Sequence, residues 1–149
     1  MRKTARAIVI KEDNLLLMKR NKFGYEYYSL IGGEIEINEQ PHETVIREVS
    51  EESSLIVDSP RLVMIENAGK MFGLQYIYLC EYVSGIPVLR PDSTEAKISA
   101  KGENLYQPLW MAISDLQKIN LLPSVLKENI IKYIGNGFPD SVVEITTGE

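Results

Sequence analysis

The sequence has little cysteine, and it lacks both long apolar runs and an excess of positive charge. Cys80 is the only cysteine among 149 residues, so no disulfide can form within the chain, and we expect a reduced, cytoplasmic protein. No stretch approaches the roughly 20 apolar residues that a membrane span requires. The N-terminal segment MRKTARAIVIKEDN is interrupted by charge too soon for a signal peptide. The sequence therefore predicts no membrane partner.

The charge balance argues against one class of partner. Lys and Arg total 16 and Asp and Glu total 21, which gives a formal net charge of −5. Proteins that hold nucleic-acid polymers need a basic surplus, so we expect none as a partner. A single small nucleotide remains compatible, because a divalent cation can bridge acidic side chains to phosphates.

Composition and patterning predict one mixed α+β domain over residues 1–149. Hydrophobic residues make up 44% and charged residues 25%, which is typical of a globular protein with a proper core. Apolar patterning predicts strands at 5–10, 15–19, 25–31, 61–66, 74–83, 86–89 and 105–111, with one more in the tail after 135. We expect helices from Pro41, at Ser114, and from Pro123 or Ser124 to about Ile134. The polar residues 91–104 predict a loop.

The helix expected from Pro41 is the most informative segment. Glu48, Glu51 and Glu52 stand at i, i+3 and i+4, so their carboxylates project from one side. Like charges at this spacing cost an isolated helix about 0.2 to 0.5 kcal/mol per pair, so a sequence built only for stability would avoid them. Carboxylate oxygens are the ligands that Mg²⁺ and Mn²⁺ prefer, and a bound ion would reverse the sign of the effect. The spacing therefore predicts a metal site.

The residues around these acids support the same prediction. Glycine lets the backbone approach closely, so a main-chain carbonyl at Gly32 or Gly33 can join a metal shell, or an amide there can face a phosphate. Arg47 is the one cation in the cluster. It can pair with Glu39 to attach the preceding loop to the helix, which leaves the other acids for metal.

This segment resembles the signature box of the Nudix hydrolase superfamily. The box reads Gly, five residues, Glu, seven residues, Arg-Glu, apolar, any, Glu-Glu, any, Gly, apolar. The positions that match it lie between 33 and 55: Gly33, Glu39, Arg47, Glu48, Val49, Glu51, Glu52 and Leu55. Ser54 departs from it, because the family usually has glycine there.

The resemblance implies an α/β/α sandwich around a mixed β-sheet. It also implies metal-dependent hydrolysis, with Mg²⁺ or Mn²⁺, of a pyrophosphate bond in a nucleoside di- or triphosphate derivative. The range runs from nucleoside triphosphates and oxidised purine triphosphates to ADP-ribose and nucleotide sugars. Homodimers are common in such folds, although the chain itself does not argue for one.

By the same resemblance, each residue of the box takes a role. Glu48 and Glu52 would be the main metal ligands, and Glu51 would assist as ligand or base. The Gly32 carbonyl would complete the metal shell, while Arg47 and Glu39 would hold the geometry.

Two other readings compete with a catalytic site. A run of acids is most often a solvated helix face, which the full spacing with Arg47 disfavours. A Nudix-type module that binds a nucleotide as a sensor without cleaving it would be expected to lose one of the box carboxylates, and this chain keeps them all. At Ser54 we expect a left-handed helix end at a cost of about 1 kcal/mol, with the site intact.

Candidates outside the box carry weaker signals. Glu103, in the polar loop before Trp110, is a candidate for an additional metal-directed acid, with Glu95 as its rival and plain loop polarity as the alternative. His42 suits packing or the surface better than a role as base.

Aromatic and basic residues near the glycines suggest substrate contacts. Tyr27 or Phe23 could stack against a base, although aromatic faces more often pack in a core. Lys70 lies in the turn-like segment GKMFG and could meet a phosphate, although a solvated turn lysine is the simpler reading.

Overall fold

A computed structural model describes residues 1–149, and its centre is one eight-stranded mixed sheet. Five strands and the first helix come from the first half of the chain: β1 (Lys3–Lys11), β2 (Asn14–Lys22), β3 (Tyr25–Ser29), β4 (Ile31–Glu34), α1 (Pro41–Ser53) and β5 (Ile56–Asn67). The second half adds α2 (Gly69–Phe72), β6 (Leu74–Ser84), α3 (Thr94–Ser99), β7 (Asn104–Ala112), the 3₁₀ helix η1 (Ile113–Lys118), α4 (Ser124–Asn136) and β8 (Val143–Thr146).

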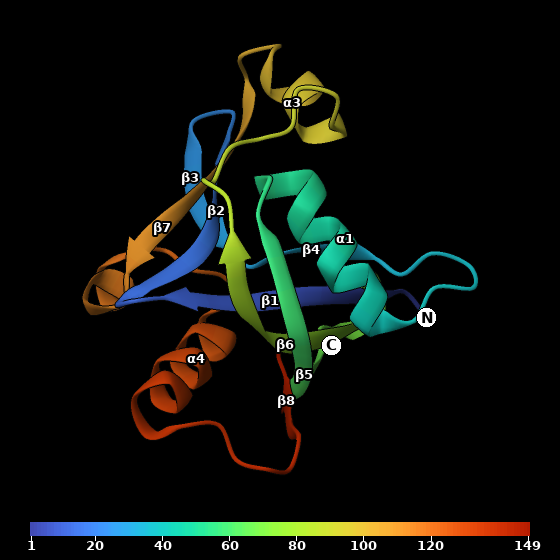
Figure 1. The fold of residues 1–149 in the computed structure, drawn as a ribbon, viewed down its shortest axis with the longest axis vertical. Coiled ribbons are helices and arrows are strands. Elements are labelled where there is room, and N and C mark those ends of the chain that lie inside the picture. The colour runs from blue at the N-terminus through green and yellow to red at the C-terminus, as the bar shows by residue number, and fades with distance from the viewer.

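The sheet is mixed because two of its pairings are parallel. The strand order is β3-β2-β1-β6-β5-β8, with β4 paired to β1 and β7 paired to β2. β1 runs parallel to β6 and β5 runs parallel to β8, while the other pairs are antiparallel. β1 is thus the strand around which the sheet is organised, as Figure 1 shows.

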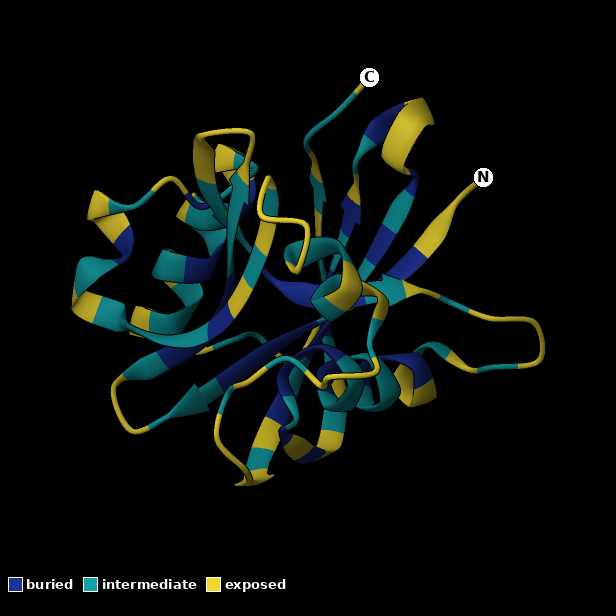
Figure 2. Ribbon diagram, turned by 90° about the horizontal axis from the view of Figure 1, so that it is seen from above, coloured by how far each residue is buried: buried dark blue, intermediate teal, exposed yellow.

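Helices cover the sheet on both sides, which gives the three layers that the resemblance implied. Val45 and Val49 of α1 pack with Ala5 and Ala7 of β1 in one buried cluster. Leu126 and Ile130 of α4 belong to a second cluster on the other face, together with Leu116 of η1. Figure 2 shows buried residues concentrated in the central strands, with exposed residues mainly in the connecting loops. No helix combines the length and the apolar character that crossing a membrane would demand.

Most predicted elements are present, with the helix from Pro41 and the hairpin of β1 and β2 among them. The strand predicted over 25–31 is in fact two, because the chain changes partner at Leu30: β3 pairs with β2, whereas β4 pairs with β1. A short tail strand, β8, also forms as expected.

Three sequence predictions were wrong in detail. Residues 86–89 form no strand, and Val88 instead donates its N–H to the carbonyl of Ser53 at the end of α1. The polar stretch 91–104 is not wholly a loop, since Ser93 caps the short helix α3 by accepting from the N–H of Ala96. The short helix near Ser114 is a 3₁₀ helix that begins at Ile113.

Candidate metal and substrate site

Local interactions fix both ends of the helix α1, which carries the acids. Pro41 occupies the first turn, where the carboxylate of Glu43 accepts from the N–H of Gln40 at 2.9 Å and the N–H of Glu43 donates to the carbonyl of Gln40. Ser54 ends the helix in the left-handed region at φ 65°, as the sequence predicted. Its hydroxyl donates to the carbonyl of Val88 at 2.7 Å, and a hydrogen bond of this kind offsets strain of about 1 kcal/mol.

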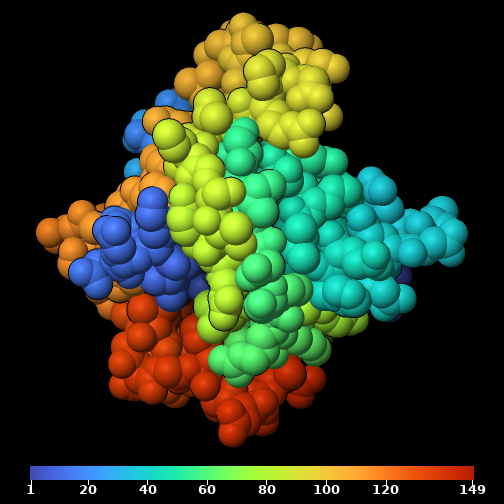
Figure 3. Space-filling view, viewed as in Figure 1, coloured from blue at the N-terminus to red at the C-terminus, as the bar shows by residue number.

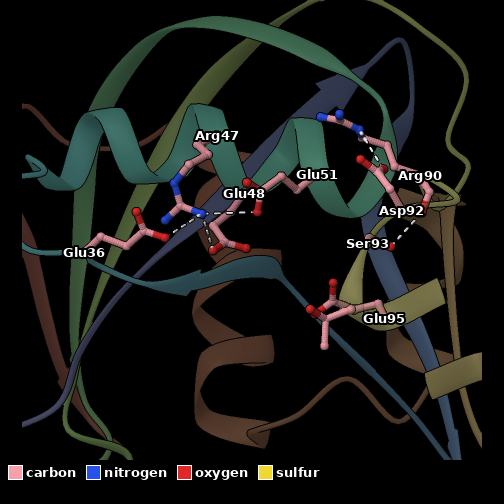
Figure 4. Close-up of a pocket in the computed structure, with 9 residues that line it drawn as sticks. Glu36, Arg47, Glu48, Glu51, Arg90, Asp92, Ser93 and Glu95 are labelled. Atoms are coloured by element: carbon pink, nitrogen blue, oxygen red, sulfur yellow. Dashed lines mark hydrogen bonds and ion pairs between the residues drawn. The ribbon is translucent and has the colours of Figure 1, made fainter. Parts of the chain in front are cut away.

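Arg47 connects the acidic cluster, because its guanidinium donates hydrogen bonds to three glutamates. Its guanidinium binds both carboxylate oxygens of Glu39, with Nε–Oε2 at 2.7 Å and Nη2–Oε1 at 3.0 Å. The remaining nitrogen, Nη1, donates to Glu48 at 2.9 Å and to Glu51 at 3.2 Å. Figure 4 shows this guanidinium lying between the helix acids and Glu36 of the preceding loop. The predicted pairing of Arg47 with Glu39 is therefore present, and it attaches the loop to the helix.

Glu39 is held as a carboxylate by several donors at once. The Arg47 guanidinium lowers the pKa of Glu39 to about 2, and the hydroxyl of Thr44 and the N–H of Glu36 contribute in the same direction. A depressed pKa stabilises the fold at pH values above the ordinary glutamate pKa, and this contribution is lost as the pH falls through the folded value.

Replacement of Glu39 by Gln should therefore lower the free energy of unfolding at pH 7 by about 1 to 2 kcal/mol, since solvent screens part of the ion pair. The deficit should shrink steadily between pH 4.5 and pH 2, because the wild-type carboxylate then becomes protonated as well. Urea unfolding followed by Trp110 fluorescence measures this. Glu128→Gln, on an exposed position of α4, is the control. A deficit that stays constant down to pH 2 would contradict the ion-pair explanation.

Glu52 is the most unusual side chain of the cluster. It is only 8% exposed, and its Oε2 is the one enclosed side-chain oxygen or nitrogen in the structure that has no hydrogen-bond partner. Burial, and then the neighbouring charge of Glu48, raise the pKa of Glu52 well above its usual range. Burial also raises the pKa of Glu48, against which the buried Glu52 lies within hydrogen-bonding reach. A buried carboxylate beside a second, partly buried one is unfavourable unless a cation accompanies them.

The backbone at Gly33 touches the same carboxyl group. A Cβ built at Gly33 would lie 2.6 Å from Cδ of Glu48, so only glycine leaves room for that side chain. At Gly32 a Cβ would lie 2.1 Å from the carbonyl oxygen of Ala5, because β4 is pressed against β1 there. Gly33 thus leaves room for the Glu48 side chain, whereas Gly32 allows β4 to approach β1 closely.

The donor set suits a hard divalent cation, although the three helix acids do not all converge. No group of three or more His, Cys, Asp or Glu side chains is arranged to hold a metal ion. Glu48 and Glu52 come together as predicted, whereas Glu51 is 45% exposed and turns to Arg47. The enclosed, partnerless oxygen of Glu52 beside Glu48 is nevertheless the kind of ligand pair that Mg²⁺ or Mn²⁺ takes.

A polar cavity of about 370 Å³ opens beside these acids. The segment Arg90–Glu95 faces α1 across it, and Figure 4 shows Arg90, Asp92 and Ser93 on the side opposite Glu51. In Figure 3 the atoms of this segment lie against the end of α1. Glu95 lines the cavity and its charge raises the pKa of Glu52, whereas Glu103 is exposed and lines neither cavity. The structure therefore favours Glu95, the rival candidate, over Glu103.

A second cavity of about 700 Å³ lies on the α4 side of the sheet, and its walls are largely apolar. Tyr27 lines it, as does Tyr25, whose ring centroid is 5.6 Å from that of Tyr27. The other two substrate candidates do not line it: Phe23 is 69% exposed, and Lys70 is exposed on α2. His42 is exposed on the first turn of α1 and lines neither cavity.

The NUDIX domain model matches residues 1–130 of the sequence. The chain belongs to the Nudix family. The match confirms the resemblance seen in the box at residues 33–55, and the protein is accordingly an enzyme of the Nudix hydrolase type. No curated protein matches the sequence.

Solved structures of other Nudix proteins share this fold. An ADP-ribose pyrophosphatase from Streptococcus suis is 21% identical, with 97% of this chain and 98% of that one covered at a TM-score of 0.66. A mutator MutT protein from Bacillus halodurans is 20% identical, with 98% and 88% covered at 0.66. A Nudix hydrolase from Nitrosomonas europaea is 15% identical, with 99% and 79% covered at 0.74. These likenesses confirm the Nudix α/β/α sandwich around a mixed sheet.

Sequence reasoning missed the polar floor of the second cavity. Arg6, Glu66 and Gln75 line it, yet each belongs to a different strand, and nothing in the linear sequence relates them. The one available signal was a charged residue inside each of two otherwise apolar strand segments, ARAIVI and VMIEN.

Proposed function

We propose that this Nudix protein hydrolyses a pyrophosphate bond in a nucleoside di- or triphosphate derivative, with Mg²⁺ or Mn²⁺ bound at the acids of α1. The observation that carries the proposal is Glu52, a buried carboxylate with one enclosed oxygen that has no hydrogen-bond partner, beside the partly buried carboxylate of Glu48. Such a pair costs several kcal/mol unless a cation or a proton neutralises it. The Nudix match makes a divalent cation the natural occupant.

The residues of the cluster then divide the work. Glu48 and Glu52 would hold the ion, with the Gly32 carbonyl as a further ligand. The bound ion would neutralise charge on phosphate oxygens and activate a water molecule. The Glu51 side chain reaches solvent, and its carboxylate pairs with Arg47, so we assign to it the uptake of a proton from that water. Arg47, fixed by Glu39, holds the carboxylates in register.

Two cavities could take the rest of the substrate. The polar cavity beside α1 suits the phosphates, and the larger, apolar-walled cavity suits the nucleoside. β4 and the residue before it link the two cavities. Leu30 lines the second cavity, and Gly33, three residues later, touches Glu48, which lines the first. A small nucleotide spanning this strand would place its base on one side of the sheet edge and its phosphates at the acids.

The proposal is tested with a substrate panel of nucleoside triphosphates, ADP-ribose and nucleotide sugars in the presence of Mg²⁺. We expect release of a nucleoside monophosphate, accompanied by pyrophosphate from a triphosphate or by a sugar phosphate from a diphosphate-linked substrate. Excess EDTA should abolish the release, and added Mn²⁺ should restore it. Tight binding of the same compounds without turnover, with either metal, would instead identify a nucleotide sensor.

A further inference from the structure

The second cavity has a charged floor beneath its apolar walls. Tyr25, Tyr27, Met71, Phe72 and Leu126 supply apolar or aromatic surface around it. The floor is built across three adjacent strands, since Arg6 lies on β1, Gln75 on β6 and Glu66 on β5. An apolar cleft with a few fixed polar groups at its base is suited to a flat heteroaromatic ring, which stacks on the walls and meets the floor with its edge.

The polar groups of the floor are held rigidly. Gln75 accepts with its Oε1 from the hydroxyl of Thr4 and from Nε of Arg6, the latter at 2.9 Å, and it donates to the carbonyl of Phe72 at 2.9 Å. Nη1 of Arg6 donates to the carbonyl of Leu30 at 3.1 Å. The two bonds of Arg6, to Gln75 and to Leu30, together hold the guanidinium plane in one orientation.

Glu66 is held in a similar way on the far side of Gln75. It is only 3% exposed, and one of its carboxylate oxygens accepts from the hydroxyl of Thr147. Burial raises the pKa of Glu66, while the charge of Arg6 acts in the opposite direction. Arg6 is partly buried, and it forms no ion pair with Glu66 within 4 Å, although both residues line the same cavity.

One nitrogen and one oxygen of this pair remain unused. Nη2 of Arg6 and Oε1 of Glu66 take part in no hydrogen bond or salt bridge of the protein. Neither is enclosed, because Oε2 of Glu52 is the only enclosed side-chain atom without a partner. Both residues line the cavity. The floor thus offers a donor on one side and carboxylate acceptors on the other.

We infer that Arg6 and Glu66 recognise the Watson–Crick edge of a guanine base, which makes guanine nucleotides the preferred substrate class. This inference rests on the proposed function for its phosphates, and on the cavity floor for its base. A guanidinium only donates and a carboxylate only accepts, so the ligand must present an acceptor beside donors. Guanine does so with its 6-oxo group next to two parallel N–H donors, the ring N1–H and the 2-amino group. Paired N–H donors on one carboxylate form a strong, charge-assisted contact.

The first test varies the ligand and leaves the protein unchanged. Binding of guanosine, inosine, adenosine and uridine to the wild-type chain is measured by calorimetry without metal. Guanosine should bind about tenfold more tightly than inosine, which lacks the 2-amino group, and about ten- to a hundredfold more tightly than adenosine or uridine. Equal binding of all four nucleosides, or binding of none, would overturn the inference.

The second test changes the carboxylate. Glu66→Gln keeps the size of the side chain and leaves one acceptor and one donor, which suits adenine better than guanine. The preference for guanosine over adenosine should fall by about tenfold or more. Glu144→Gln, on the neighbouring strand β8 and exposed outside the cavity, is the matched control and should keep the wild-type ratio. An unchanged ratio in Glu66→Gln would overturn the assignment, and the nucleoside panel decides the matter if this variant does not fold.

Failure of this inference is distinguishable from failure of the proposed function. Nucleosides carry no phosphate, so their binding does not depend on metal or on hydrolysis. A chain that prefers guanosine but hydrolyses no nucleotide would refute the proposed function alone. A chain that hydrolyses nucleotides without preference among bases would refute the role of Arg6 and Glu66 alone.

Discussion

Replacement of Glu52 by Gln is expected to lower turnover by about two to four orders of magnitude while leaving the fold intact. The glutamine keeps the shape of the side chain but removes the negative oxygen that we assign to the metal. Steady-state kinetics with the best substrate of the panel, at saturating Mg²⁺, measures the effect. Glu128→Gln, an exposed glutamate on α4, should retain wild-type turnover.

For the same variant we expect no loss of stability, in contrast to the loss of turnover. Because the pKa of Glu52 is raised in the fold, its ionisation destabilises the metal-free protein at pH values above the ordinary glutamate pKa. Metal-free Glu52→Gln should therefore be at least as stable as the wild type at pH 7 to 8. Near-normal turnover in this variant, or marked unfolding, would contradict the assigned role.

Substitutions of the adjacent Gly32 and Gly33 should have different effects on activity and on stability. Gly33→Ala places a methyl group 2.6 Å from the carboxyl carbon of Glu48, which is the far end of a flexible side chain. That carboxyl must move, so we expect turnover to fall by about a hundredfold, since displacements of about 1 Å at a reacting geometry have effects of this size. The free energy of unfolding should change little.

Gly32→Ala should behave differently. Its methyl group would lie 2.1 Å from a backbone oxygen of β1, which cannot move without disturbing the central strand. We expect a loss of several kcal/mol in stability. Gly135→Ala, within α4 and with nothing within 4 Å of its Cβ, is the control and should be neutral or slightly stabilising. Thermal unfolding alongside kinetics distinguishes the three variants. Equal losses of stability at positions 32 and 33 would refute the distinction.

The sequence predicted the parts of the molecule that depend on local spacing. The helix beginning at Pro41, its left-handed end at Ser54 and the pairing of Arg47 with Glu39 all follow from residues within about 15 positions of each other. The change of strand partner at Leu30 did not follow, because only the neighbouring strands decide where β3 ends. The convergence of three acids was only partly right, since Glu51 turns to Arg47 while Glu48 and Glu52 lie together.

The cavity floor could not be predicted for a related reason. Arg6 and Glu66 are separated by 60 positions in the sequence. They line the same cavity because their strands, β1 and β5, both pair with β6. Periodicity identifies which face of a strand is buried, but it does not say which strands are neighbours. The Nudix box, by contrast, is contiguous, and so the part of the site to which we assign the chemistry could be identified from the sequence.

The parallel pairing of β1 with β6 has a consequence for how the protein is made. β1 (Lys3–Lys11) leaves the ribosome well before its parallel partner β6, which spans Leu74–Ser84. Until that segment emerges, the central strand of the sheet has one open edge, with its amide and carbonyl groups available to other chains. Slow translation between these two points would prolong that exposure, so synthesis rate is expected to influence the soluble yield of this protein.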